Sequence, residues 1–181
     1  MARVEDLKPE NLTPEQKAIH DRIAGSRGGT VRGPFAIWLR NPPLADAADK
    51  FGTILRKGKL DQRLFELMVL LVARHWSAQY EWFAHVRHAR EVGIPEPVIE
   101  ALRHRRKPEL TRDDERLVYD LVTEMNETRT LSQPTYDRAV AMLGLDLVIE
   151  LITALGFYTM VAIMLNGFDA PVPGGERPLP T

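Results

Sequence analysis

The chain contains no cysteine among its 181 residues. A protein without thiols cannot form a disulfide, bind a metal through thiolates or use a sulfur nucleophile. The chain also lacks an excess of charge of either sign, because it has 24 basic and 25 acidic residues and a net charge of -1. This balance gives no electrostatic reason to expect a nucleic-acid partner. The composition therefore disfavours thiol chemistry and nucleic-acid binding.

An N-terminal signal segment is also missing, because the first ten residues are charged from Arg3 onward and contain no apolar stretch. We therefore expect a cytoplasmic protein. One uncharged run, residues 151–168, approaches the roughly 20 apolar residues that a membrane span requires. It contains polar residues such as Asn166 and has no basic flank, so we expect a buried helix in the core or at a subunit interface, with no membrane partner.

Strand signals are absent as well, since no alternating pattern bounded by hairpin turns occurs. Helix signals are frequent. Thr13 precedes a proline and predicts a helix start, Asp61 predicts another, and Gly93 predicts a helix end. We expect an all-α fold, large enough to bury about 70% of the surface of its unfolded chain.

The chain is expected to divide into three parts. Residues 1–32 are predicted to form an N-terminal helix and a flexible turn, residues 33–168 a helical domain, and residues 169–181 an irregular Pro- and Gly-rich tail. Within the domain, apolar residues between Leu44 and Leu55 recur at helical spacing and predict an amphipathic helix.

The most informative segment is residues 63–93, RLFELMVLLVARHWSAQYEWFAHVRHAREVG. Glu66 is a single carboxylate in an otherwise apolar helix, where it is either functional or a surface residue near the helix N-terminus. Glu81 and His85 are four residues apart, so their side chains share a helix face, and His88 continues that face. These residues are therefore candidates for a site, although a surface Glu–His pair would have the same spacing.

This segment resembles the core motif of the carboxymuconolactone decarboxylase and alkylhydroperoxidase-D superfamily. In the peroxidase branch a Glu is followed after eleven residues by a cysteine, a second cysteine three positions later, and a His four positions after that. The matching positions here are Glu66, Ala78, Glu81 and His85. Both cysteine positions are therefore empty. The resemblance extends over residues 33–168 and is strongest from Glu66 to Gly93.

The resemblance implies an all-α helical bundle of the carboxymuconolactone decarboxylase type that assembles as a homo-oligomer, a trimer or a hexamer. It implies an enzyme that needs no cofactor and acts on a small oxygenated acid or lactone, either as a decarboxylase-like lyase or as an isomerase. In this interpretation Glu66 orients His85, His85 transfers the proton, and Glu81 holds the substrate or relays the proton. Imidazole suits this role because it exchanges a proton near neutral pH.

Four further residues are candidates for substrate binding. They are Tyr80, Trp38, His88 and Arg74, with Arg87 as an alternative to Arg74 for an anionic substrate. The basic connector, which we define as residues 103–108 (RHRRKP), is typical of a solvated surface and is by itself weak evidence for an anionic ligand.

Three other functions compete with the proton-transfer enzyme. Thiol peroxidase activity is disfavoured because Ala78 supplies no sulfur. A metal site made of Glu66, Glu81, His85 and His88 has suitable ligand types for zinc or iron, but its spacing matches no standard metal motif, so we expect no metal. A non-enzymatic binding or assembly module on the same fold also remains open, because fold does not determine function.

Overall fold

The computed structural model describes residues 2–26 and 28–180, and all regular structure within these ranges is helical. This confirms the predicted all-α fold. The α-helices are α1 (Pro14–Ser26), α2 (Pro34–Trp38), α3 (Pro42–Arg56), α4 (Gln62–His75), α5 (Gln79–Glu91), α6 (Glu96–Arg103), α7 (Asp113–Thr128), α8 (Gln133–Leu143) and α9 (Leu145–Gly167), with short 3₁₀ turns at Pro9–Asn11 and Pro173–Gly175.

Side-chain caps fix the starts of two helices. Thr13 Oγ1 accepts the backbone N–H of Gln16 at 3.2 Å while the Gln16 side chain accepts the N–H of Thr13 at 3.0 Å, which is a capping box. Asp61 accepts the N–H groups of Arg63 and Leu64 at the start of α4. Both starts agree with the sequence prediction, and α5 ends before Gly93, whose φ is +82°.

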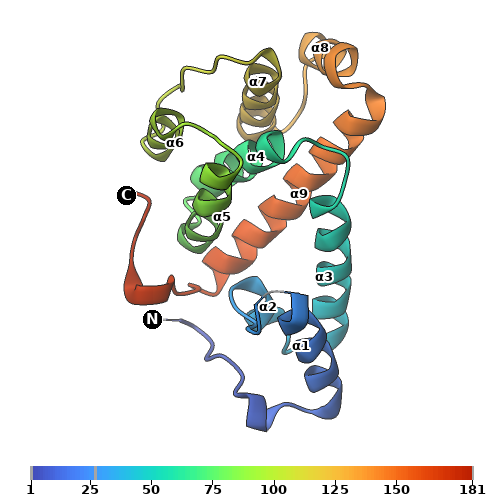
Figure 1. Cartoon of the computed structure of the whole chain (residues 1–181), viewed down its shortest axis with the longest axis vertical. Coiled ribbons are helices and arrows are strands. Elements are labelled where there is room, and N and C mark those ends of the chain that lie inside the picture. Colours follow the sequence, from blue (N-terminus) through green and yellow to red (C-terminus); the bar gives the residue numbers. More distant parts are fainter. Residues whose placement is uncertain (1, 27, 181) are drawn as a thin grey trace.

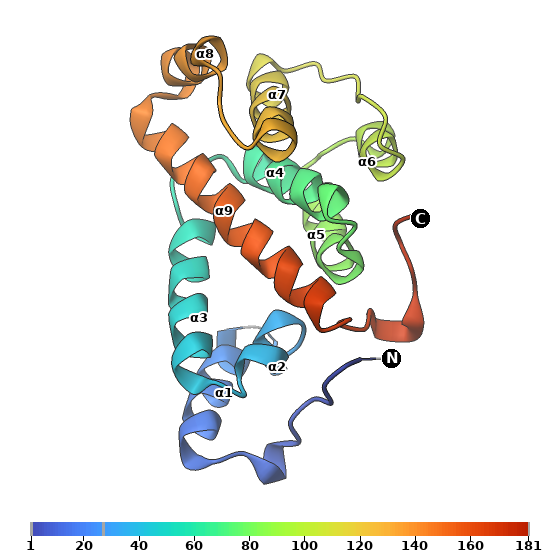
Figure 2. The same cartoon turned by 180° about the vertical axis from the view of Figure 1, so that it is seen from behind.

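Helix α4 is the centre of the bundle. Its residues from Leu64 to Arg74 are all buried, because α5, α7 and α9 pack around it. Helix α9 crosses the molecule diagonally, with α4 and α5 on one side and α3 on the other (Figures 1 and 2). The lone carboxylate of Glu66 therefore lies in the interior, facing neighbouring helices on several sides.

Helix α9 is long and apolar enough to cross a membrane by length and composition, with a mean hydropathy of 2.0 over its most apolar window. In the structure 44% of that window is buried. The face that includes Leu151, Tyr158 and Leu165 is buried in the bundle. The opposite face is exposed and carries Ile149 and Ile163.

The apolar pattern of α3 is only partly buried. Ala48 and Leu55 pack inward, but Leu44, Phe51 and Ile54 of the same pattern are exposed. The sequence pattern therefore predicted the helix but not which of its apolar residues enter the core.

The C-terminal tail is ordered by specific contacts. Leu179 is buried, and its backbone N–H and C=O both bond to the side-chain amide of Gln79 on α5, at 2.9 Å and 3.0 Å. Arg3 N donates to Phe168 O at 3.1 Å, so the N-terminal segment lies beside the end of α9, where the tail begins (Figure 1). The Pro- and Gly-rich composition of the tail does not predict this anchoring.

Candidate active site

Glu66 of α4 and His85 of α5 form the centre of the candidate site. Glu66 Oε2 lies 2.8 Å from His85 Nδ1, and both side chains are largely buried, at 8% and 16% exposure. A carboxylate can only accept, so Nδ1 carries the proton and donates it to Glu66. This bond leaves Nε2 as the nitrogen that can exchange a proton with a ligand.

Glu81 lies one helical turn before His85 and is 1% exposed. Neither of its carboxylate oxygens has a hydrogen-bond partner within the described residues. Burial raises the pKa of the Glu81 carboxyl well above its ordinary value, because the charged form loses its hydration without gaining a partner. Glu81 is therefore suited to be a neutral acid that donates a hydrogen bond.

Tyr158 of α9 completes the inner part of the site. Its ring lies edge to face against the ring of His85, with centroids 5.1 Å apart and an interplanar angle of 90°. Burial raises the pKa of the Tyr158 phenol further above its already high ordinary value, and the carboxylate of Glu66 adds to this effect, while the neighbouring Arg56 guanidinium acts in the opposite direction. The phenol consequently remains protonated and available as a donor.

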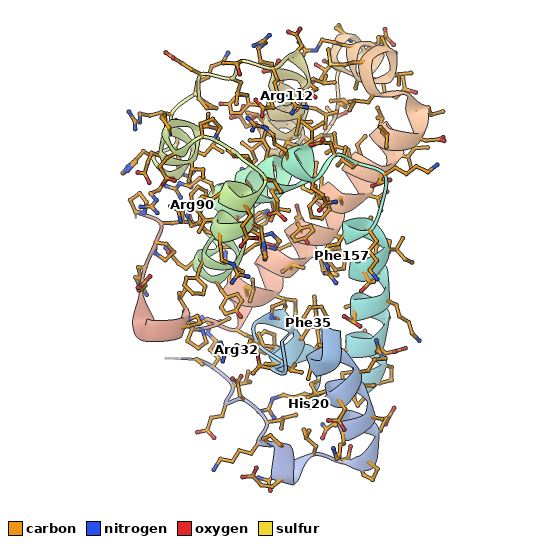
Figure 3. The ribbon with its side chains drawn as sticks, in the orientation of Figure 1. His20, Arg32, Phe35, Arg90, Arg112 and Phe157 are labelled. Atoms are coloured by element: carbon orange, nitrogen blue, oxygen red, sulfur yellow. The ribbon has the colours of Figure 1, made fainter. Side chains whose placement is uncertain are left out.

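These side chains border a cavity of about 600 Å³. Its lining includes Glu81, His85 and Tyr158, while Glu66 stands behind His85 and outside the lining. The remaining walls come from α2, α3, α9 and the C-terminal tail, through Phe35, Arg56, Phe157, Glu176 and Pro178. Figure 3 shows Phe35, Phe157, Arg32 and Arg90 around this part of the molecule.

Positive charge predominates around the cavity. Its lining contains five arginines and two carboxylates: Arg32, Arg56, Arg87, Arg90, Arg103, Glu81 and Glu176. Arg90 bonds both oxygens of Glu96, and Arg87 lies 3.4 Å from Glu91, so these two charges are already paired. Arg56 instead donates to the neutral hydroxyl of Thr53 at 3.2 Å. Because it contacts the hydroxyls of Thr53 and Tyr158, Arg56 is a candidate cation for an anionic substrate group.

Two of the predicted substrate-binding residues line the cavity and two do not. Tyr80 and His88 are part of the lining, and His88 Nδ1 also lies 2.9 Å from Glu91 Oε2. Trp38 lies outside the cavity, behind Phe35, with ring centroids 5.4 Å apart. Arg74 also lies outside the lining and binds Ser77 and the carbonyl of Pro180. The alternative to it, Arg87, does line the cavity.

Arg56, Tyr158 and Phe157 were missed by the sequence reasoning. Tyr158 and Phe157 lie on α9, far from residues 63–93 in sequence, and Arg56 ends the preceding helix α3. They line the same cavity as His85 because α9 packs against α4 and α5, and α3 packs against α9. The only local signal was Tyr158, a polar aromatic residue in an uncharged helix. Such residues usually place the hydroxyl near a polar partner when buried.

The four residues of the metal alternative do not gather into one ligand set. Glu66 and His85 are paired, Glu81 has no polar partner among the described residues, and His88 contacts Glu91. Within residues 2–26 and 28–180, no group of three or more His, Asp or Glu side chains is arranged to hold a metal ion.

Comparison with known proteins gives matches in structure alone. No family model matches this sequence, and no curated protein matches it. An uncharacterised peroxidase-related protein from Silicibacter sp. TM1040 superposes with a TM-score of 0.76 at 14% identity, covering 93% of this chain and 90% of that one. A peroxidase-related protein with an AhpD core, from Ralstonia eutropha JMP134, has a TM-score of 0.76 at 13% identity, covering 99% and 98% of the two chains.

A third structure is the debrominase Bmp8, an alanine variant in complex with 2,3,4-tribromopyrrole. It has a TM-score of 0.74 at 14% identity and covers 97% of this chain and 92% of its own. Identities this low establish the fold and leave the chemistry open. The chain shares the AhpD-like helical fold of these structures.

Proposed function

We propose that this protein is a cofactor-independent enzyme that transfers protons to and from carbon, as a decarboxylase-like lyase or an isomerase of a small oxygenated acid or lactone. The observation that carries the proposal is the 2.8 Å bond between Glu66 and His85 at the wall of the cavity. A carboxylate behind an imidazole orients the ring and stabilises its protonated form. The chain has no cysteine to use this pair for thiol chemistry.

In the decarboxylation, Arg56 and the other arginines of the cavity lining hold the substrate as an anion. The bond between the ring carbon and the carboxylate breaks, and its electron pair moves into the conjugated lactone carbonyl as CO₂ leaves. The protonated Glu81 donates a hydrogen bond to the resulting dienolate oxygen. The imidazolium of His85 then delivers a proton to carbon and is reprotonated from solvent, so charge and atoms balance.

Isomerisation requires the same groups. His85 removes a proton from a carbon next to the carbonyl, Glu81 stabilises the enolate, and His85 returns the proton at another carbon. The volume of about 600 Å³ suits a small ring compound. The debrominase Bmp8, which has a similar fold, was crystallised in complex with 2,3,4-tribromopyrrole. This complex supports the proposal that the cavity binds small cyclic ligands.

The test uses deuterium incorporation from D₂O, followed by NMR, across a panel of unsaturated lactone carboxylates and β-keto acids. Glu66→Gln and His85→Asn should each lower the exchange rate by about 10² to 10⁴. The double variant should be little slower than either single one, because residues that act as a unit are not additive. His88→Asn is the matched control, since His88 also lines the cavity but bonds the surface residue Glu91.

Full activity of His85→Asn would remove the catalytic role of this pair. If no panel compound exchanged or lost CO₂ but one bound tightly in the cavity, the binding-module alternative would replace the enzyme. In that case the same variants would change affinity and no turnover would be found.

We also propose that the protein self-associates, as a trimer or hexamer, through the exposed apolar faces of α3 and α9. Leu44, Phe51, Ile54, Ile149 and Ile163 are each between 43% and 67% exposed. Large exposed apolar surfaces commonly mark interfaces. Light scattering coupled to size-exclusion chromatography tests this proposal, and a monomeric mass would contradict it.

A further inference from the structure

A second, smaller hollow lies apart from the candidate active site. It has a volume of about 140 Å³ and is bordered by the end of α4, the end of α6 with the basic connector, and α7. It shares no lining residue with the larger cavity. Four potentially cationic side chains line it: Arg74, His75, Arg105 and Arg106.

Two of these guanidinium groups converge on one neutral oxygen. Arg74 Nη1 donates to Ser77 Oγ at 2.8 Å, and Arg105 Nη2 donates to the same oxygen at 3.1 Å. Arg74 is only 7% exposed, and its Nε has no hydrogen-bond partner within the described residues. Burial and the charge of Arg105 lower the pKa of Arg74. Two like charges held this close are unfavourable unless an anion lies nearby.

The backbone also holds this cluster in place. Ser77 has φ +49° and Arg105 has φ +55°, which are left-handed conformations that non-glycine residues adopt infrequently. These are two of the four non-glycine positive-φ residues in the described chain, and they are joined to each other through a hydrogen bond.

The opposite wall offers neutral polar groups and one acid. Thr123 and Asn126 on α7 can donate hydrogen bonds, while Glu127 contributes a negative charge. The three arginines outnumber this single carboxylate, so the hollow keeps a net positive charge. Cations at the ends of α4 and α6 also interact with the helix dipoles. That interaction explains single charges at helix ends, but it does not require three guanidinium groups to meet around a hollow.

We propose that this hollow binds one phosphoryl oxyanion, either free phosphate or the phosphate group of a small metabolite. Guanidinium groups match the geometry of phosphate oxygens through paired N–H donors. A hollow of about 140 Å³ accommodates one such group, and it is too small for a nucleotide. The basic connector thereby contributes Arg105 and Arg106 to this site, and Arg103 to the larger cavity.

The test is isothermal titration calorimetry with inorganic phosphate, repeated with phenyl phosphate, in a chloride buffer of constant ionic strength. We expect saturable binding of one phosphate per chain. The double variant Arg105→Gln, Arg106→Gln should weaken it at least tenfold. Both side chains are exposed, so their loss should leave the fold intact. The matched control is Arg112→Gln with Arg116→Gln, because these arginines at the start of α7 lie outside the hollow and already pair with Asp114 and Asp113.

Stronger binding of phenyl phosphate than of inorganic phosphate would identify a metabolite as the source, and the reverse would identify free phosphate. Both results support the site. The proposal would be overturned if the heat of phosphate titration did not saturate, or if the double variant bound phosphate as tightly as the wild type. The arginines would then only interact with the dipoles of the helix ends. Because the larger cavity shares none of these residues, this result is independent of the proposed enzyme activity.

Discussion

The ring of Tyr158 lies at 90° to the ring of His85, with centroids 5.1 Å apart, and so limits the orientation of the imidazole. Phe65 contacts the same tyrosine ring, with centroids 5.4 Å apart. The position of His85 therefore depends on aromatic packing as well as on its bond to Glu66.

From this packing we expect Tyr158→Phe to keep most of the stability, within about 1.5 kcal/mol, since only the hydroxyl is lost. Tyr158→Ala should lower the free energy of unfolding by about 3–5 kcal/mol, because it removes the whole buried ring. Urea denaturation followed by circular dichroism measures both. If the phenylalanine variant were as unstable as the alanine variant, the hydroxyl would be the stabilising group and not the ring.

Glu81→Gln should stabilise the protein at pH 8 by about 1–3 kcal/mol, because it removes a buried carboxyl without a partner that must take up a proton when the chain folds. The pKa of Glu81 is raised in the folded state, so the folded protein retains this proton above the ordinary value of 4.5 while the unfolded chain has lost it. The stability of the wild type relative to the variant should therefore fall as the pH rises above about 4.5 towards the folded pKa. Near pH 4 the two proteins should be similar.

Thermal unfolding from pH 4 to pH 9 measures this difference. The control is Glu115→Gln, another buried glutamate, which forms an ion pair with Arg63. Its substitution should destabilise the protein at pH 8, because it leaves the arginine charge without its partner. A Glu81→Gln variant that was less stable than the wild type at every pH would mean that the carboxylate has a partner in solution.

Gly33→Ala should displace Tyr80 from its position. A Cβ at residue 33 would lie 2.4 Å from Tyr80 Cε1, and Gly33 has φ +60°. We expect a loss of about 1–3 kcal/mol in unfolding free energy, part from backbone strain and part from the displaced ring. Gly29→Ala is the control for strain alone, since Gly29 has φ +86° and a Cβ added there would meet no atom within 4 Å.

A double-mutant cycle with Tyr80→Ala separates the two contributions to the Gly33→Ala effect. If the ring contact matters, Gly33→Ala should cost less in the Tyr80→Ala background than in the wild type. Simple additivity would instead assign the whole effect to backbone strain.

Gln79→Ala should release the C-terminal tail from α5. The two bonds between the Gln79 amide and Leu179 are worth about 0.5–1.5 kcal/mol each. Their loss should speed cleavage after Glu176 by a glutamyl endopeptidase about tenfold, as measured by the intact mass. Gln133→Ala, which removes a surface amide bonded to Asp137, is the control and should leave that rate unchanged. An equal rate in Gln79→Ala would mean that the burial of Leu179 alone holds the tail.

The helical class and the caps at Thr13 and Asp61 could be predicted from local spacing in the sequence. The Glu66–His85 pair joins residues 19 positions apart on two helices, and it was expected only from the resemblance to the superfamily motif. Whether Glu66 was buried could not be decided locally, because the answer depends on α5 and α9 covering that face of α4. The structure places it in the interior, bonded to His85.

The sequence pattern could not predict which residues outside residues 63–93 contribute to the site. Arg74 follows Glu66 on α4 by eight residues, about 12 Å along the helix axis, and its guanidinium bonds Ser77 beyond the end of the helix. Arg56 is instead the cation that α3 brings to the cavity. The tail shows the same difficulty, because Pro- and Gly-rich composition does not indicate that Leu179 is bonded to Gln79 through both its N–H and its C=O.

The orphan carboxyl of Glu81 also offers a way to find the natural ligand. A compound that bonds to this carboxyl would relieve a penalty present in the ligand-free protein, so part of its affinity, and of its thermal shift, would depend on residue 81. Screening small acids and lactones against the wild type and Glu81→Gln side by side would select compounds whose shift changes between the two proteins. A difference in thermal shift between the two proteins would then identify the ligands that bind next to residue 81.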